Sequence, residues 1–319
     1  MPERRRSITA GPGIAAAALL LGSCATVPGA VPPQLRIAIT VDDLPVHAPY
    51  PPGVTALEVN REMIAALKAG HVPATGFVNA VNVTDGATTE ALRNWRKASF
   101  ILGNHTWSHR HLSEMSSADF EEEVTRNEPV LREFGAGSDW RWFRYPYLDE
   151  GKDEAQRAAG RQVLARHGYR VADVTIGFSD WAFTGAWARC NAATDKAGIA
   201  ELERLYLDAA KQSIAVARST AQALYGRDIP YVLLMHVSAM SAHMMPQVIQ
   251  LYRDAGFSFV TLAQAESDPV YRSDIDLSVP GRVSDWTLAQ QKGVKLPQAT
   301  DLTAKLDSIC PPGSAATSR

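Results

Sequence analysis

The chain has 319 residues, 46% of them hydrophobic, and a formal net charge of -2 at pH 7. This length suits one large α/β domain with a full core, or two smaller domains. No long basic run occurs beyond the first residues, so the chain lacks the electrostatic footprint of a nucleic-acid-binding protein and we expect no nucleic-acid partner.

The N-terminal residues have the pattern of an export signal. Three arginines at positions 4–6 precede an apolar run over residues 14–21 that is too short to span a bilayer. The Leu-Gly-Ser-Cys sequence that ends at Cys24 resembles the lipobox of bacterial lipoproteins. We therefore predict a signal over residues 1–24, membrane attachment only through a lipidated Cys24, and a location in the cell envelope, outside the cytoplasm. An ordinary secretory peptide, which would leave a periplasmic or secreted protein, is the alternative.

A tether rich in Pro, Ala and Gly, residues 25–34, leads into an alternation of strands and helices. Short apolar, β-branched runs predict strands over residues 35–41, 73–78, 99–102, 141–143, 169–174, 231–235 and 257–261. Amphipathic periodicity predicts helices over residues 56–69, 89–97, 117–134, 153–167, 199–224 and 246–255. Such alternation predicts a parallel sheet with helices outside, for which a barrel is the natural closure.

The periodicity fades beyond Asp268 into sequence containing Pro, Gly and Ser. We predict one α/β catalytic domain over residues 35–268 and a C-terminal tail over residues 269–319 that lies on it. Cys190 and Cys310 could form a disulfide in an oxidising compartment or remain two independent thiols, and the sequence leaves both alternatives open.

Chemically interesting side chains follow the predicted strands. In chain order they are Asp42 and Asp43, His105 and His109, Arg144 to Tyr147, Asp180 and Trp181, and His236. The carboxyl ends of the strands of a parallel barrel open on one face, where active sites form. We therefore expect these five segments to converge.

A metal site is predicted from the two histidines. His105 and His109 are four residues apart, so on a helical turn both imidazoles would face the same way, whereas His111 would point elsewhere. With Asp43 as the carboxylate, they form a standard open catalytic set for zinc that leaves a position for water. The expected cofactor is a divalent metal, Zn²⁺ by ligand type, with Co²⁺ or Ni²⁺ as alternatives.

The five segments together resemble the ordered motifs of the polysaccharide deacetylases, carbohydrate esterase family 4. They are Thr40-Val41-Asp42-Asp43, His105-Thr106-Trp107-Ser108-His109, Arg144-Tyr145-Pro146-Tyr147, Asp180-Trp181 and Leu234-Met235-His236. The resemblance covers residues 35–262 and implies a distorted (β/α)7 barrel as a single catalytic domain.

The resemblance implies a metal centre and a base beside it. Asp43, His105 and His109 would hold the metal, and Asp42 would be the general base that deprotonates the attacking water. Arg144 would pair with Asp42 and orient it. Two adjacent carboxylates can divide these tasks if the metal neutralises one and the other stays free.

The same resemblance implies the remaining roles. The backbone N–H of Tyr147 would help the metal to stabilise the oxyanion, and Trp181 would wall the acetyl pocket and bind substrate. His236 would protonate the leaving amine while Asp180 holds its ring. Histidine suits this task because its proton is available near neutral pH.

These expectations describe a hydrolase that removes N-acetyl groups from an N-acetylglucosamine-containing polysaccharide, such as peptidoglycan or a chitin-like oligomer. An esterase acting on the O-acetyl groups of a polysaccharide such as xylan is one alternative. A catalytically dead surface protein that binds carbohydrate is another, although the intact aspartates and histidines argue against it.

The chain departs from the family pattern around these motifs. Leu44 and Pro45 follow the aspartates where the family usually has Gly, and Arg110 follows His109 where it usually has Pro. His47 could reach the substrate or be an exposed loop histidine. Between Trp181 and the helix over residues 199–224 we expect a Trp-bearing loop.

Overall fold

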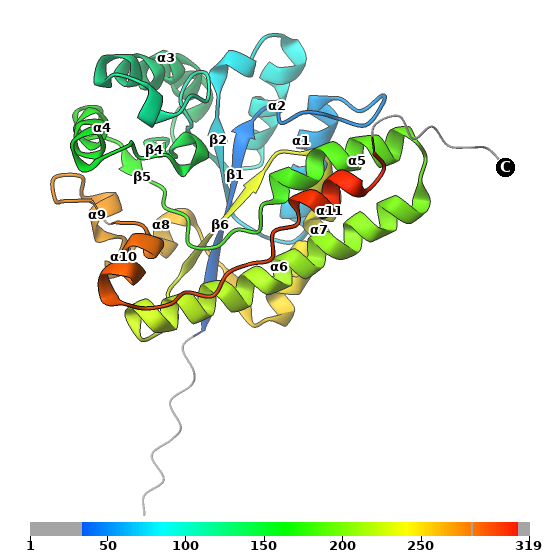
Figure 1. The fold of residues 1–319 in the computed structure, drawn as a ribbon. Coiled ribbons are helices and arrows are strands. Elements are labelled where there is room, and N and C mark those ends of the chain that lie inside the picture. The colour runs from blue at the N-terminus through cyan, green and yellow to red at the C-terminus, as the bar shows by residue number, and fades with distance from the viewer. Residues whose placement is uncertain (1–33, 282, 312–319) are drawn as a thin grey trace, which may run out of the picture. The chain divides into compact units, whose positions relative to one another are not determined.

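The computed structural model describes residues 34–281 and 283–311, and Figure 1 shows their fold. The predicted export signal, Cys24, nearly all of the tether and the last eight residues lie outside the described residues. Within the described part, none of the helices combines the length and the apolar character needed to cross a membrane.

Seven parallel strands form one sheet. They are β1 (Leu35–Leu44), β2 (Ala74–Val78), β3 (Ile101–Asn104), β4 (Trp142–Phe143), β5 (Arg170–Val171), β6 (Tyr231–His236) and β7 (Phe257–Phe259). Their order is β5-β4-β3-β2-β1-β6, and β7 pairs with the start of β1. The chain beyond β5 bonds to β6, because the Ile176 N–H donates to Val232 O at 3.2 Å and the Leu234 N–H donates to Ile176 O at 3.1 Å. The sheet therefore curls into a distorted barrel, as predicted.

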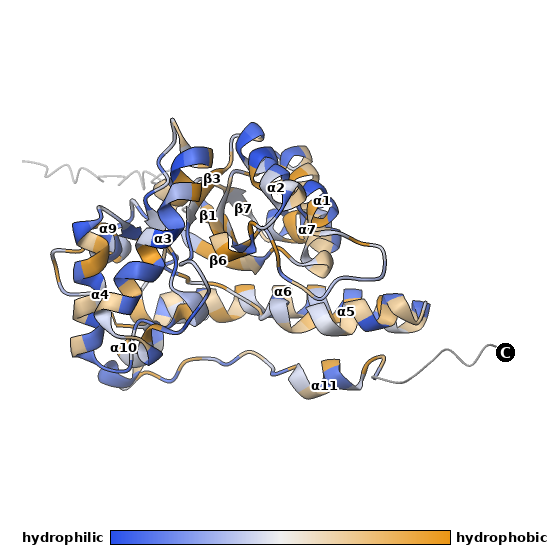
Figure 2. Ribbon diagram, turned by 90° about the horizontal axis from the view of Figure 1, so that it is seen from above, coloured by the Kyte–Doolittle hydropathy of each residue, from blue (hydrophilic) through white to orange (hydrophobic). Residues whose placement is uncertain are grey.

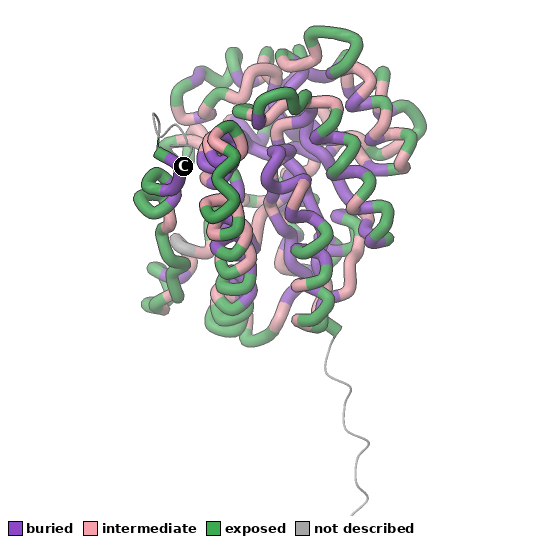
Figure 3. Tube along the Cα trace, turned by 90° about the vertical axis from the view of Figure 1, so that its right-hand side faces the viewer, coloured by how far each residue is buried: buried purple, intermediate pink, exposed green. Residues whose placement is uncertain are grey.

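Helices surround the sheet. They are α1 (Ala56–Ala69), α2 (Gly86–Lys97), α3 (Ser117–Gly135), α4 (Glu154–Arg166), α5 (Phe183–Ala192), α6 (Lys196–Tyr225), α7 (Ala239–Asp254) and the short α8 (Leu262–Ala265). Capping boxes open α1 at Thr55, α2 at Asp85 and α3 at Ser116, which satisfies backbone N–H groups that a helix start leaves unpaired. The strands are largely apolar, and burial is concentrated on them while the outer helix faces are exposed (Figures 2 and 3).

Three sequence expectations are wrong in detail. The Trp-bearing loop is instead helix α5, which buries Phe183 and Trp187 in the core. Helix α7 begins after the cap Ser238 and carries Pro246 inside it, so the proline does not mark its first turn. Strand β5 has two residues, because the chain beyond it turns away to bond with β6.

The chain beyond β7 is more regular than its composition predicts. It contains α9 (Arg272–Ile275), α10 (Asp285–Lys292) and α11 (Thr303–Ser308). Its later part runs along α6, where Lys292 Nζ donates to Leu224 O at 2.8 Å and Gln212 bonds to Thr300 (Figure 1).

A disulfide between Cys190 and Cys310 joins the end of α5 to the residues after α11. Arg189 supports the same junction by donating from Nε to Cys310 O at 2.8 Å. The disulfide decides between the two alternatives that the sequence left open for these cysteines. Such bonds are typical of proteins that fold in an oxidising compartment.

Candidate active site

The predicted site residues converge at the carboxyl ends of the strands. A cavity of about 460 Å³ opens there, and most of the predicted residues line it. Its lining consists of Asp42, Asp43, His47, His105, His109, Tyr145, Tyr147, Leu148, Trp181, Leu234 and His236. Arg144 and Asp180 are buried and bond to Asp42 and His236, which are part of this lining.

The two aspartates lie near the end of strand β1, where regular side-chain alternation would send neighbours to opposite faces. Asp43 instead has a positive φ of 67°, and the β1–β2 register shifts between Val41 and Leu44. Both carboxylates can therefore reach the same cavity. Asp42 lies opposite His236 in the β1–β6 ladder, which brings a carboxylate and an imidazole to adjacent positions.

Asp43, His105 and His109 form a candidate metal site, since one ligand atom from each lies within 4.8 Å of the others. Asp43 Oδ1 is 3.5 Å from His105 Nε2 and 3.3 Å from His109 Nε2. This oxygen is buried and has no hydrogen-bond partner. A buried acceptor facing two imidazole nitrogens fits a cation placed among them.

The tautomer of His105 supports this fit. Its Nδ1 lies 2.8 Å from Arg144 O, and a carbonyl oxygen can only accept, so Nδ1 carries the proton. That leaves the lone pair of Nε2 directed at Asp43, as a metal ligand requires. Burial and the neighbouring His105 lower the pKa of His109 to about 4, so its imidazole is also neutral near neutral pH.

The two histidines do not lie on a helical turn, so the prediction that helical spacing brings their imidazoles together is wrong. Residues 105–110 form an irregular loop in which Thr106 and His109 have positive φ angles of 64° and 57°. Glu123 of α3 holds the loop by accepting the Ser108 N–H at 2.8 Å, and the Thr106 hydroxyl accepts the His109 N–H at 3.2 Å. The pair converges through this turn rather than through helical spacing.

Asp42 is buried beside the candidate metal site and pairs with Arg144. Arg144 Nη1 donates to its two carboxylate oxygens at 3.3 and 3.2 Å. The guanidinium is itself fixed, because Nε donates to Ala172 O at 2.7 Å and Nη2 to the Thr40 hydroxyl at 3.1 Å. The arrangement provides a carboxylate that is oriented by a guanidinium and lies next to a candidate cation site.

His236 is held by Asp180, whose Oδ1 lies 2.8 Å from the ring Nδ1. Asp180 Oδ2 accepts the His236 backbone N–H at 2.8 Å and the Ser241 hydroxyl at 2.7 Å. Burial by itself would lower the pKa of His236, because it disfavours the charged ring. The charge and hydrogen bond of Asp180 outweigh this effect and raise the pKa of His236 to about 9. A protonated imidazole in this position can act as a general acid.

Comparison with known proteins matches the part of the chain that carries the first three of the five segments. Residues 30–172 match the family model described as polysaccharide deacetylase. The matched segment is part of a polysaccharide deacetylase domain. A chitin deacetylase from Colletotrichum lindemuthianum is 28% identical over 179 residues, which cover 53% of this chain and 67% of that protein.

Solved structures share the fold of the deacetylase domain. That of the chitin deacetylase from Colletotrichum lindemuthianum has a TM-score of 0.52 at 20% identity and covers 74% of this chain and 90% of its own. A pseudoenzyme of carbohydrate esterase family 4 from Bacillus anthracis also has a TM-score of 0.52, at 14% identity, covering 74% of this chain and 66% of its own. Because the fold also occurs in a pseudoenzyme, activity must be argued from the site residues.

Exposed apolar side chains border the deacetylase cavity. Tyr147, Leu148 and Trp181 are 59%, 47% and 52% exposed, and all three line the cavity. The Tyr147 ring stacks on His111 at 3.8 Å between centroids, and His111 is not in the cluster of Asp43, His105 and His109. Exposed apolar groups around a cavity with a few converging polar groups are typical of a ligand-binding rim.

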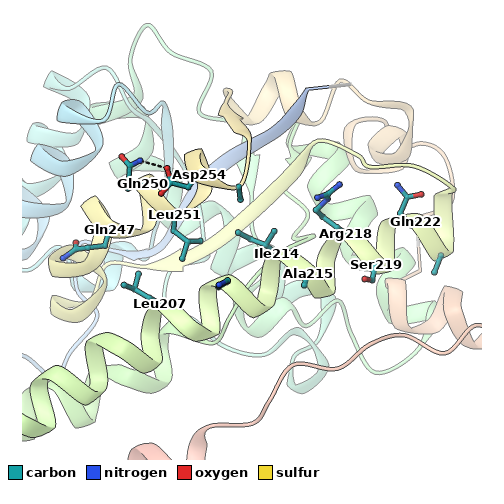
Figure 4. A pocket seen from close by; sticks show the side chains of 13 residues that line it. Leu207, Ile214, Ala215, Arg218, Ser219, Gln222, Gln247, Gln250, Leu251 and Asp254 are labelled. Carbon is teal, nitrogen blue, oxygen red and sulfur yellow. Dashed lines mark hydrogen bonds between the residues drawn. The ribbon is translucent and has the colours of Figure 1, made fainter. Parts of the chain in front are cut away.

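Two features were not resolved by sequence reasoning. His47 lines the cavity and contacts Asp43, so it is not the exposed loop histidine that was one of its two alternatives. The short spacing between positions 43 and 47 is the only sequence signal for this contact. A larger groove of about 1260 Å³ lies between α6 and α7, around Leu207, Ile214 and Leu251 (Figure 4). None of the predicted site residues lines it, so the smaller cavity is the candidate active site.

Proposed function

We propose that the chain is a metal-dependent hydrolase that removes N-acetyl groups from an N-acetylglucosamine-containing polysaccharide, either peptidoglycan or a chitin-like oligomer. The observation that carries this proposal is the unpartnered Asp43 Oδ1, which faces two imidazoles in the cavity that Asp42 and His236 also line. Amide hydrolysis needs an activated nucleophile, a polarised carbonyl and a proton for the leaving amine.

The residues divide these tasks. A divalent cation held by Asp43, His105 and His109, Zn²⁺ by ligand type, would supply Lewis acidity toward the acetyl carbonyl and the attacking water. Asp42, oriented by Arg144, takes a proton from that water.

Two further groups would act on the oxyanion and on the leaving group. The backbone N–H of Tyr147 donates to the developing oxyanion. His236, held by Asp180, delivers a proton to the departing nitrogen.

The rim supports a sugar substrate. Tyr147, Leu148 and Trp181 offer apolar surface on which the apolar face of a pyranose ring can lie, with Trp181 walling the acetyl group. The raised pKa of His236 favours amides over esters, because an amine leaving group depends on protonation more strongly than an alcohol does. O-acetyl esterase activity on a xylan-type polysaccharide is the second candidate.

Acetate release from a substrate panel tests the proposal. We expect zinc-loaded protein to release acetate from chitooligosaccharides or peptidoglycan fragments faster than from acetylated xylan. Asp43→Ala and His105→Ala should lose bound zinc and activity together, as measured by metal analysis of the purified variants. His71→Asn, which removes an exposed imidazole outside the cavity, is the control and should keep both.

The outcomes separate the candidate functions. Faster release from acetylated xylan would favour the esterase. Binding of the oligosaccharides without acetate release from any substrate would indicate a dead carbohydrate-binding protein. Full zinc occupancy in Asp43→Ala would show that the ligand set is assigned wrongly.

We also propose that the protein is exported and anchored through a lipidated Cys24. The signal pattern of residues 1–24 supports this, and so does the Cys190–Cys310 disulfide, which suits an oxidising compartment. Cys24→Ser should move the protein from the membrane fraction to the soluble fraction of cells. Wild-type protein found in the soluble fraction would contradict the anchor.

A further inference from the structure

His47 is an imidazole in the cavity that has no part in the proposed chemistry. Its Nδ1 lies 2.6 Å from Asp43 Oδ2. A carboxylate without a proton can only accept, so His47 Nδ1 donates this hydrogen bond. Both side chains are largely buried, with 18% exposure for His47 and 14% for Asp43, so solvent screens the contact only weakly.

The backbone fixes His47 in this position. The Val46 N–H donates to Asp43 O at 2.9 Å, which closes a turn directly after the aspartates. The His47 N–H donates to the Tyr50 hydroxyl at 3.1 Å, and Asn60 of α1 donates from Nδ2 to Pro45 O at 2.8 Å. Because the turn is bonded on both sides, the backbone at His47 is fixed, and the ring is held by its hydrogen bond to Asp43.

The two oxygens of Asp43 have different surroundings. Oδ2 receives the hydrogen bond from His47, whereas Oδ1 faces His105 and His109 and has no hydrogen-bond partner. The contact with His47 therefore sets the rotation of the carboxylate, and with it the direction of Oδ1. His47 is not one of the three clustered ligand residues.

Without this contact, Asp43 Oδ2 would lose the hydrogen bond that holds the carboxylate in place. The carboxylate could then rotate away from the two histidines that face Oδ1. In metal sites, partners that orient a ligand typically contribute a factor of about 10–100 to metal affinity.

We propose that His47 is a positioning residue that holds Asp43 in the rotamer that binds the metal, and so raises the affinity of the site for a divalent cation. This inference rests on the proposed metal site. It assigns His47 neither to the ligands nor to the groups that touch the substrate.

Zinc affinity measures this role without a substrate. Metal-free protein is titrated with Zn²⁺ in competition with a chromophoric chelator. We expect His47→Ala and the bulkier His47→Leu to raise the zinc Kd by about 10–100-fold. His47→Asn should recover most of the affinity, because the asparagine Nδ2 can donate to Asp43 Oδ2 as the imidazole does. His71→Asn is the matched control and should bind like wild type.

The possible results are distinct. If the folded Ala or Leu variant, checked by circular dichroism, binds zinc as tightly as wild type, the positioning role is overturned. If the Asn variant loses as much affinity as the Ala variant, a hydrogen bond to Asp43 Oδ2 is not what sets the affinity, and the proposal is again wrong. If wild type binds no zinc, the proposed metal site fails and this inference fails with it. Reduced affinity restored by Asn supports the inference.

Discussion

Asp42→Asn is expected to keep bound metal and to lower kcat by about 10²–10⁴-fold, because an amide cannot act as the base for the attacking water. The side chain keeps its shape beside Arg144 but loses its charge. Removing one partner of a buried ion pair commonly costs about 3–5 kcal/mol, so the variant should also melt at a lower temperature than wild type. Acetate release and metal content are therefore measured well below that melting point.

The matched control is Asp43→Asn, which makes the same change from carboxylate to amide at the neighbouring residue. It should lose metal as well as activity, because Oδ1 of Asp43 faces His105 and His109. The opposite result, with metal lost in Asp42→Asn and kept in Asp43→Asn, would show that the roles of the two aspartates are reversed.

His236→Ala is expected to lower kcat by a similar factor, about 10²–10⁴-fold, with the metal content unchanged, because the leaving amine would depart unprotonated. The wild-type rate should then fall on the alkaline side as His236 loses its proton. Without metal the pKa of His236 is raised from 6.5 to about 9, and a bound cation nearby would lower it. The alkaline limb of kcat is therefore expected between these values.

Asp180→Asn tests whether the alkaline limb of kcat reports the loss of the proton from His236. Burial favours the neutral ring of His236, and the Asp180 charge opposes that effect. Removing the charge should move the alkaline limb toward lower pH, while His236→Ala should abolish it. A limb that keeps its position in Asp180→Asn, or near-normal turnover in His236→Ala, would mean that another group supplies the proton.

Much of the fold was predictable because its signals are local. Each strand and helix has its own apolar pattern, and strands alternating with helices leave few arrangements other than a parallel sheet. The exceptions occur where tertiary contacts override local sequence. Helix α5 is stabilised by packing of Phe183 and Trp187 in the core, and β5 is short because the following chain bonds to β6.

The sequence alone determined which residues could take part in the chemistry, since five ordered motifs placed after successive strands must meet at one end of a parallel sheet. Only the tertiary structure decided how they meet. Asp43 and His109 adopt positive φ angles that no spacing rule predicts, and both turns are held by contacts from elsewhere in the chain. The pairing of Cys190 with Cys310 and the contact of His47 with Asp43 likewise depend on where the backbone turns. Residue type and spacing are local properties, whereas side-chain direction is set by hydrogen bonds and packing between segments distant in sequence.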